Sequence, residues 1–144
     1  NITDMPLSFF LTLAFASFYA AHVKEEKKYY LLFYFACAMA LLTGLRHAER
    51  LAGILGMSGY LPLAGALAAE RSAANADVPI FLAHGTQDEM IPLPRAAASR
   101  DALAALGYAV EWHQYPMGHS VCAPEVQDVQ RWLLRVLDPA VDKK

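Results

Sequence analysis

Two polar side chains of this 144-residue chain, Asp88 and His119, combine residue types that can do acid–base chemistry. Asp88 lies in the glycine-containing segment HGTQDEMIP, and His119 follows a glycine in the segment YPMGHS. A carboxylate that hydrogen-bonds an imidazole orients the ring, and the imidazole can then take a proton from a nucleophile. An acid that precedes its base along the chain matches the second half of the order Ser…Asp…His. We therefore predict that Asp88 is the acid and His119 the base of a hydrolytic site.

The segments that must position these side chains alternate between strand and helix patterns. Apolar runs bounded by glycine, serine or proline predict buried strands over Ala52–Met57, Val78–His84 and Tyr108–Tyr115. Helical patterns cover Ala38–Leu51, Leu63–Ala73, Pro94–Leu106 and Glu125–Leu137, and Gly107 is expected to end the third of these helices. This alternation predicts an α/β fold, a parallel sheet flanked by helices, in which functional groups gather at the carboxyl ends of the strands.

Three motifs carry a family resemblance. HGTQDEMIPL, then YPMGHSVC about 30 residues later and a final helix ending in RWLLRVL, resemble the carboxylesterase/lysophospholipase group of α/β-hydrolases, which includes the acyl-protein thioesterases. AGILGMSGYLPL is similar to the strand and loop between nucleophile and acid in that group. The resemblance covers residues 38–138, about 70% of the chain, and implies the C-terminal half of an α/β-hydrolase.

The resemblance also implies a function. Asp88 matches the acid and His119 the base of a serine esterase that acts on acyl esters or thioesters through an acyl-enzyme. This chemistry needs no cofactor, and the group's soluble members imply a cytoplasmic location. The half-sheet expected for residues 38–144 would expose a hydrophobic edge, so we expect this part alone to be oligomeric or poorly soluble.

The family's nucleophile motif, Gly-x-Ser-x-Gly, has no intact counterpart. By alignment it should fall in LFYFAC, where Tyr34 stands in place of the serine, and Leu32 and Ala36 replace the glycines. Side chains at the glycine positions would crowd the tight turn that lifts the serine above the sheet. The family's second oxyanion loop also has no counterpart in residues 1–30. The nucleophilic serine is therefore not found in this chain.

Other side chains are weak substitutes for it. Ser58 lies in GMSGY, which is only a fragment of the motif, and only one helix and one strand fit between Ser58 and Asp88. Ser120 neighbours the base on one loop, and Cys37 lies three residues beyond the expected position. Of the other histidines, His84 is expected to pack beneath the Asp88 loop.

Residues 1–37 have a different composition from residues 38–144, and we treat them as a separate hydrophobic segment. Residues 5–23 and 29–45 carry no Asp, Glu, Lys or Arg, and the charged segment KEEKK lies between them. Each run approaches the roughly 17–25 residues that a membrane-spanning helix needs. Three interpretations stay open: a membrane hairpin, a strand and helix of a soluble core, or foreign sequence in a composite chain. A membrane-associated or incomplete, non-catalytic protein is therefore the alternative function.

Composition excludes several other classes. The hydrophobic share of 56% excludes a disordered chain. A formal net charge of −2 without a basic stripe gives no indication of nucleic-acid binding. The two cysteines lack the spacing of a metal site, and the five histidines are too scattered to form a ligand set, so no metal is expected. The partner that the family resemblance implies is an ester or thioester substrate.

Overall fold

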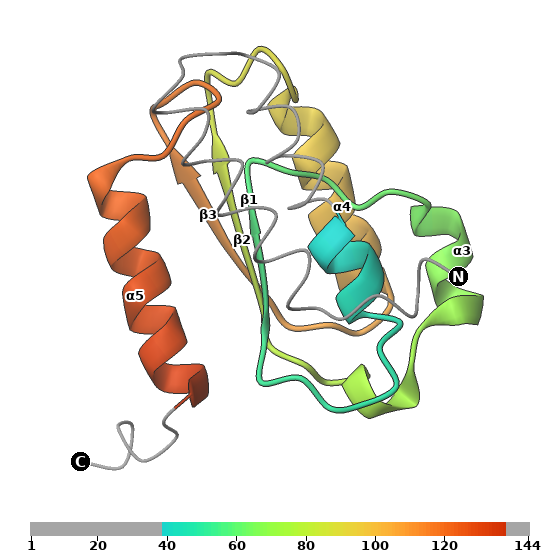
Figure 1. Cartoon of the computed structure of the whole chain (residues 1–144). Coiled ribbons are helices and arrows are strands. Elements are labelled where there is room, and N and C mark those ends of the chain that lie inside the picture. Colours follow the sequence, from blue (N-terminus) through green and yellow to red (C-terminus); the bar gives the residue numbers. More distant parts are fainter. Residues whose placement is uncertain (1–38, 138–144) are drawn as a thin grey trace, which may run out of the picture.

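Three parallel strands form the centre of the computed structural model, which describes residues 39–137. They are β1 (Ile54–Met57), β2 (Ile80–Gly85) and β3 (Val110–Tyr115), and they lie in the order β1-β2-β3 (Figure 1). Ile80 of β2 pairs with Ile54 on one side and with Val110 on the other. The parallel α/β sheet predicted from the sequence is confirmed.

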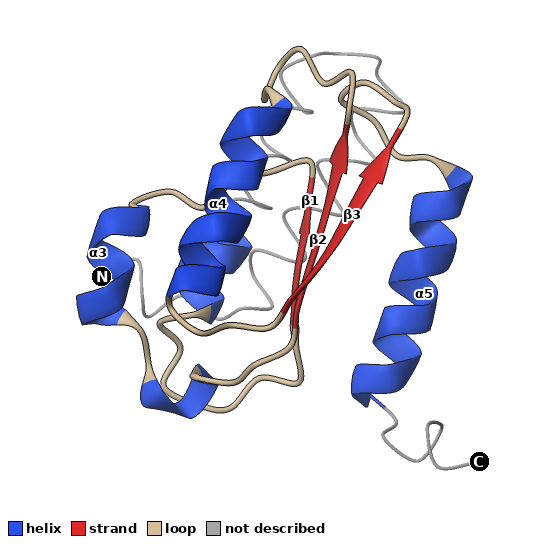
Figure 2. Ribbon diagram, turned by 180° about the vertical axis from the view of Figure 1, so that it is seen from behind, coloured by secondary structure: helices blue, strands red, loops and turns tan. Residues whose placement is uncertain are grey.

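Helices cover both faces of this sheet. α3 (Ala64–Glu70) and α4 (Leu93–Ala105) lie on one side, and α5 (Ala123–Leu137) lies on the other, as Figure 2 shows from behind. A short 3-10 helix, η2 (Ala73–Asn75), links α3 to β2. All six residues of β2 are buried, because the central strand of a sheet covered on both faces is shielded on each side.

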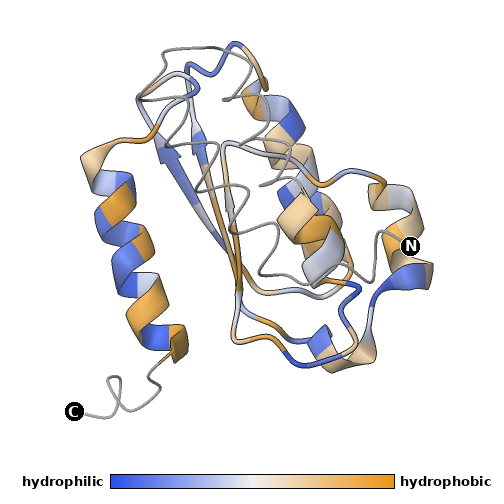
Figure 3. Cartoon of the chain, viewed as in Figure 1, coloured by the Kyte–Doolittle hydropathy of each residue, from blue (hydrophilic) through white to orange (hydrophobic). Residues whose placement is uncertain are grey.

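Side chains of alternate residues on β2 enter two separate cores. Ile80 and Leu82 belong to the core on the α3 and α4 side, together with Leu67 and Leu103. Phe81 and Ala83 belong to the core beneath α5, whose other buried members are Tyr115, Met117 and Trp132. Hydrophobic and hydrophilic residues alternate along α5 (Figure 3), which is the pattern of a helix with one face on a sheet.

The ends of α4 agree with the signals in its sequence. Pro94 lies in the first turn, where a missing N–H leaves no helical hydrogen bond unmade. Gly107 follows the helix with φ +88°, a left-handed conformation that glycine adopts without steric cost.

The prediction of a helix over residues 38–51 was wrong at its C-terminal end. Within the described residues the helix covers 39–44, and the chain then turns. The buried Asn75 explains the irregular segment that follows: its side-chain amide donates to the carbonyls of His47 and Glu49 and accepts from the Leu51 N–H. These three bonds satisfy backbone groups that a helix would otherwise have paired.

The helix predicted over Leu63–Ala73 is likewise shorter than expected. α3 ends at Glu70, and Ser72 then accepts from the Ala74 N–H to begin η2. Competition between a serine hydroxyl and the helical backbone accounts for this break.

Several predictions concern residues outside 39–137. They include the separate segment 1–37, Tyr34, Cys37 and the possible membrane hairpin up to residue 38. The last residues of that hairpin, 39–45, are described, and Leu41 and Leu45 pack in the core of the domain. Within the described residues, no helix has both the length and the apolar character required to cross a membrane. The expectation of oligomers or poor solubility stays a prediction.

Candidate active site

The carboxyl ends of β2 and β3 bring two loops together. Gly85 at the end of β2 is in register with Tyr115 at the end of β3. Beyond these residues, the Thr86 N–H donates to the Tyr115 carbonyl at 2.8 Å, and the Gln87 N–H donates to the Met117 carbonyl at 3.0 Å. These bonds extend the strand pairing into the loops that carry Asp88 and His119.

Gly85 allows the two loops to approach this closely. A Cβ atom at this position would lie 2.4 Å from the carbonyl oxygens of both Met117 and Gly118. Both oxygens belong to the backbone, so a side chain at residue 85 would have to push the loops apart. The glycine that follows His84 is therefore required by the close packing of the two loops.

The two predicted site residues, Asp88 and His119, are in contact. Asp88 Oδ2 lies 2.5 Å from His119 Nδ1, which is a short, charge-assisted hydrogen-bond distance. The exposed fraction is 0% for the Asp88 side chain and 6% for that of His119. A carboxylate can only accept, so Nδ1 carries the proton and Nε2 of the neutral ring carries the lone pair. This is the tautomer that a general base needs.

The second carboxylate oxygen of Asp88 is held by its own loop. Asp88 Oδ1 accepts from the backbone N–H groups of Met90 and Ile91, both at 2.9 Å. Such a turn, in which the aspartate side chain bonds the backbone two and three residues ahead, is a local consequence of the sequence. It leaves Oδ2 directed at His119.

His84 has a larger part in the site than the sequence suggested. It is fully buried, as expected for a residue beneath the loop. However, its Nε2 also lies 2.8 Å from the Ile91 carbonyl oxygen and 3.4 Å from Asp88 Oδ2. The sequence feature that could have indicated this role is the imidazole within an apolar strand, because a buried polar ring requires a hydrogen-bond partner.

Two of the other candidate nucleophiles, Ser58 and Ser120, lie within the described residues. Ser58 is 2% exposed, has φ 48°, and its hydroxyl forms no hydrogen bond. Ser120 is exposed on the His119 loop. The Ser58 hydroxyl therefore makes no hydrogen bond to the His119 ring.

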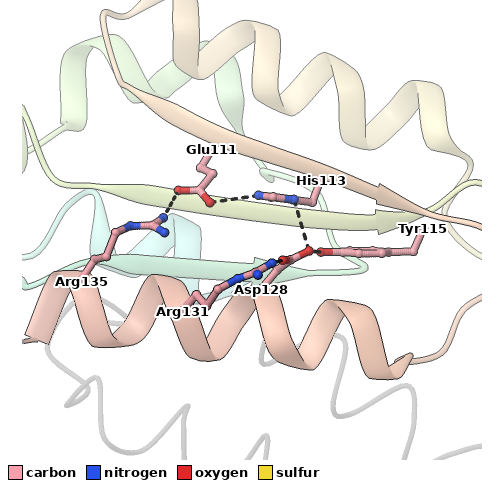
Figure 4. A network of polar contacts seen from close by, with 6 residues as sticks. All are labelled: Glu111, His113, Tyr115, Asp128, Arg131 and Arg135. Atoms are coloured by element: carbon pink, nitrogen blue, oxygen red, sulfur yellow. Dashed lines mark hydrogen bonds and ion pairs between the residues drawn. The ribbon is translucent and has the colours of Figure 1, made fainter. Parts of the chain in front are cut away.

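A separate polar network fastens α5 to β3 (Figure 4). His113 lies on a face of β3, where it stacks on Phe81 at 4.8 Å between ring centroids. Its Nε2 is 3.0 Å from Glu111 Oε1, and Arg135 of α5 donates to the other Glu111 oxygen at 2.6 Å. Burial opposes the ionisation of Glu111, but these two hydrogen bonds outweigh it and lower the pKa of its carboxyl.

Asp128 anchors the second half of this network. Its carboxylate accepts from the Tyr115 hydroxyl at 2.7 Å and also pairs with Arg131. The hydrogen bond from Tyr115, followed by the one from Arg131, lowers the pKa of Asp128. Burial and the neighbouring Asp128 raise the pKa of Tyr115 above its usual value. These hydrogen bonds and ion pairs therefore connect α5 to β3, the strand that precedes the His119 loop.

No group of three or more His, Cys, Asp or Glu side chains among residues 39–137 is arranged to hold a metal ion.

Comparison with known proteins identifies the family. A model of the phospholipase/carboxylesterase family matches residues 33–137. The chain belongs to this family of ester and thioester hydrolases. It is 39% identical over 100 residues to acyl-protein thioesterase 1 of Yarrowia lipolytica, a match that covers 67% of this chain and 44% of the relative. The match to acyl-protein thioesterase 1 of Gibberella zeae is 39% over 105 residues and covers 71% and 45%.

Solved structures show the same partial correspondence. Arabidopsis thaliana SOBER1 superposes with a TM-score of 0.68 at 26% identity, covering 72% of this chain and 50% of that protein. Zea mays acyl-protein thioesterase 2 gives 0.65 at 28% identity, covering 71% and 52%. The described strands and helices are thus part of an α/β-hydrolase fold, and the chain spans about half the length of the curated relatives that it matches.

Proposed function

We propose that this chain carries the acid and the base of a carboxylic-ester or thioester hydrolase. Asp88 is the acid that orients the ring, and His119 is the general base. The observation that supports this proposal is the 2.5 Å hydrogen bond between Asp88 Oδ2 and His119 Nδ1 at the carboxyl end of the sheet. In this reaction Nε2 of His119 removes the hydroxyl proton of a serine, which attacks the acyl carbonyl. The same imidazole then returns the proton to the leaving alcohol or thiol, and water hydrolyses the acyl-enzyme.

The reaction also needs a nucleophile, which members of this family carry in a Gly-x-Ser-x-Gly segment. The corresponding segment of this chain, LFYFAC, contains no serine. A tyrosine phenol at residue 34 is a poor replacement for an activated serine, and Leu32 and Ala36 remove the glycines that the tight turn needs. We therefore expect the chain as it stands to be unreactive toward a fluorophosphonate probe. Peptide mapping would identify any labelled residue, and labelling at a single residue would name a nucleophile in this chain.

A chimera tests the acid and base directly. The part of the Yarrowia lipolytica thioesterase that precedes its matched region would be joined to residues 38–144 of this chain. We expect the chimera to be labelled by the probe and to hydrolyse a thioester. Replacement of Asp88 by Asn should lower the rate by about 10³–10⁴-fold, because the imidazole then loses its required tautomer. The His119→Ala variant should lose labelling as well.

Two results would count against the proposal. One is a folded chimera, by circular dichroism, that neither reacts with the probe nor hydrolyses the thioester. The other is a chimera whose labelling and turnover are the same after His119→Ala. A matched control is Glu89→Gln, which changes an exposed carboxylate directly beside Asp88 and should leave the rate within a few-fold.

The uncharged residues 5–23 and 29–38 support a second proposal, association with a membrane. Residues 39–45 of the second run belong to the described domain, where Leu41 and Leu45 are buried in the core. Extraction of membranes with carbonate at high pH tests this association. A spanning hairpin would keep the chain in the pellet, whereas release into the supernatant would exclude such a hairpin.

A further inference from the structure

We propose that His84 is a positioning residue that holds the Asp88 carboxylate in the orientation that His119 requires. The inference rests on the proposed roles of Asp88 and His119, and it adds a third side chain that acts through them. His84 is on β2, four residues before Asp88, and its side chain is 0% exposed. It is therefore attached to the most buried strand of the described sheet.

The main connection runs through the backbone of Ile91. A carbonyl oxygen only accepts hydrogen bonds, so the 2.8 Å contact with Ile91 requires that His84 Nε2 carries a proton and donates it. The N–H of the same Ile91 donates to Asp88 Oδ1 at 2.9 Å. His84 thus links Ile91 to strand β2, and the N–H of Ile91 in turn holds the Asp88 carboxylate. Pro92 follows Ile91 and restricts its backbone to extended conformations, which makes this tie stiffer.

A second contact acts on the carboxylate itself. His84 Nε2 lies 3.4 Å from Asp88 Oδ2, the oxygen that accepts from His119. This distance is too long for a strong hydrogen bond. Nε2 nevertheless lies beside a carboxylate that is shielded from water, where electrostatic interactions are stronger than in solvent. A side chain that only filled space would supply neither contact and would leave the Ile91 carbonyl without its donor.

The structure offers matched variants for a test. His84→Gln keeps an N–H donor at a reach similar to Nε2, whereas His84→Phe fills the space without a donor. Ser58 provides the control for disturbing the core, because it follows β1 and its N–H donates to the carbonyl of Ala83, the residue before His84. Its hydroxyl is buried but forms no hydrogen bond. Ser58→Ala thus removes a buried polar atom from a segment bonded to β2 without removing a donor from Asp88.

The measurement is the proton NMR signal of the His119–Asp88 hydrogen bond in the full chain. A proton in a short N–H···O⁻ bond resonates far downfield of ordinary amides, and ¹⁵N labelling of histidine assigns it to a ring. We expect the signal in the original chain, in His84→Gln and in Ser58→Ala. In His84→Phe we expect its loss or an upfield shift, although circular dichroism shows that the variant is folded.

The outcomes separate positioning from packing. An unchanged signal in His84→Phe would overturn the proposal, and so would an equal loss in Ser58→Ala and His84→Phe. Absence of the signal from the folded original chain would also overturn it, because there would be no bond to position. The readout requires no turnover. If hydrolysis fails in the chimera but the signal responds as expected, the role of His84 stands and the proposed function falls.

Discussion

At the scale of single residues, the site depends on contacts between backbone atoms as much as on its acid and base. Asp88 uses one oxygen for the N–H groups of Met90 and Ile91 and the other for His119. The loops that carry these side chains meet at Gly85, which has no room for a Cβ atom. The motif around Asp88 thus encodes both the carboxylate and the space for the second loop.

Replacement of Gly85 by Ala should therefore destabilise the protein and weaken the contact between Asp88 and His119. Its new methyl group would lie 2.4 Å from two backbone oxygens, and overpacking of this kind typically costs about 1–3 kcal/mol. Urea denaturation and the downfield proton signal would measure the two effects.

Gly118→Ala is the matched control on the facing loop. A Cβ atom there meets the Gln87 carbonyl at 3.6 Å, an ordinary van der Waals distance. We expect a change within about 0.5 kcal/mol. Equal effects of the two substitutions would contradict the interpretation that close approach at Gly85 is what makes the glycine necessary.

At the scale of elements, α5 is attached to the sheet by a buried tryptophan and by the network of Figure 4. Trp132 is 3% exposed and packs against Phe81 at 5.7 Å between ring centroids. Gly53 leaves space for the indole, because a Cβ at that position would lie 2.6 Å from the ring. The amphipathic pattern predicted this helix, but the pattern does not state which residue of the sheet the indole contacts.

Trp132→Ala should destabilise the protein by about 3–5 kcal/mol, because it removes a large buried side chain from the core beneath α5. Leu134→Ala on the same helix should cost less than about 1 kcal/mol, since Leu134 is 52% exposed. Both substitutions introduce the same helix-favouring residue, so the comparison isolates burial. Urea unfolding of the two variants measures the difference, and similar losses would show that α5 is not held through Trp132.

The first described helix shows that a distant residue can override a local sequence pattern. The residues after Gly44 continue a helical pattern, yet the helix ends because Asn75, more than 20 residues away, bonds the backbone of residues 47–51. A propensity is a weak preference, and a buried side chain that satisfies three backbone groups outweighs it.

At the scale of the whole molecule, the buried and paired carboxylates make stability depend on pH. Glu125 in the first turn of α5 is 0% exposed, and its carboxyl oxygens have no partner of good hydrogen-bond geometry among residues 39–137. Burial raises the pKa of Glu125 to about 7, against 4.5 for an ordinary glutamate. The folded state therefore favours the protonated acid, and stability falls as pH rises from about 4.5 to about 7.

Glu125→Gln should remove this loss, because the amide is neutral at every pH and has nearly the same shape. We expect the variant to be more stable than the original chain above pH 7, with the difference shrinking toward pH 4.5. Thermal melting between pH 4.5 and pH 8.5 measures this. Glu49→Gln changes an exposed glutamate and should leave the pH profile unchanged. A parallel shift of the Glu125→Gln curve at all pH values would contradict the explanation.

The lowered pKa values of Glu111 and Asp128 act in the opposite sense. Their contribution is complete above the usual carboxyl pKa, near 4, and is lost as pH falls through the lowered values. Together with Glu125, these groups place the greatest contribution to stability on the acidic side of neutrality.

The sequence alone determined the kinds of element and their order, and it predicted the pairing of Asp88 with His119. Hydrophobic periodicity, Pro94 and Gly107 act within a few residues, so strands and helices follow from local chemistry. A parallel sheet then brings the loops after successive strands to one edge, which is why Asp88 and His119 could be paired before their contact was seen.

Only the tertiary structure decided the contacts that depend on residues distant in the sequence or on the path of a loop. These are the bond from His84 to the Ile91 carbonyl, the support of a loop by Asn75, and the burial of Glu125. Each is determined by which atoms surround a polar group after packing. The free energy of a polar group depends on its burial and its hydrogen-bond partners. Residue type and spacing do not specify either of these, because both arise only when the chain packs.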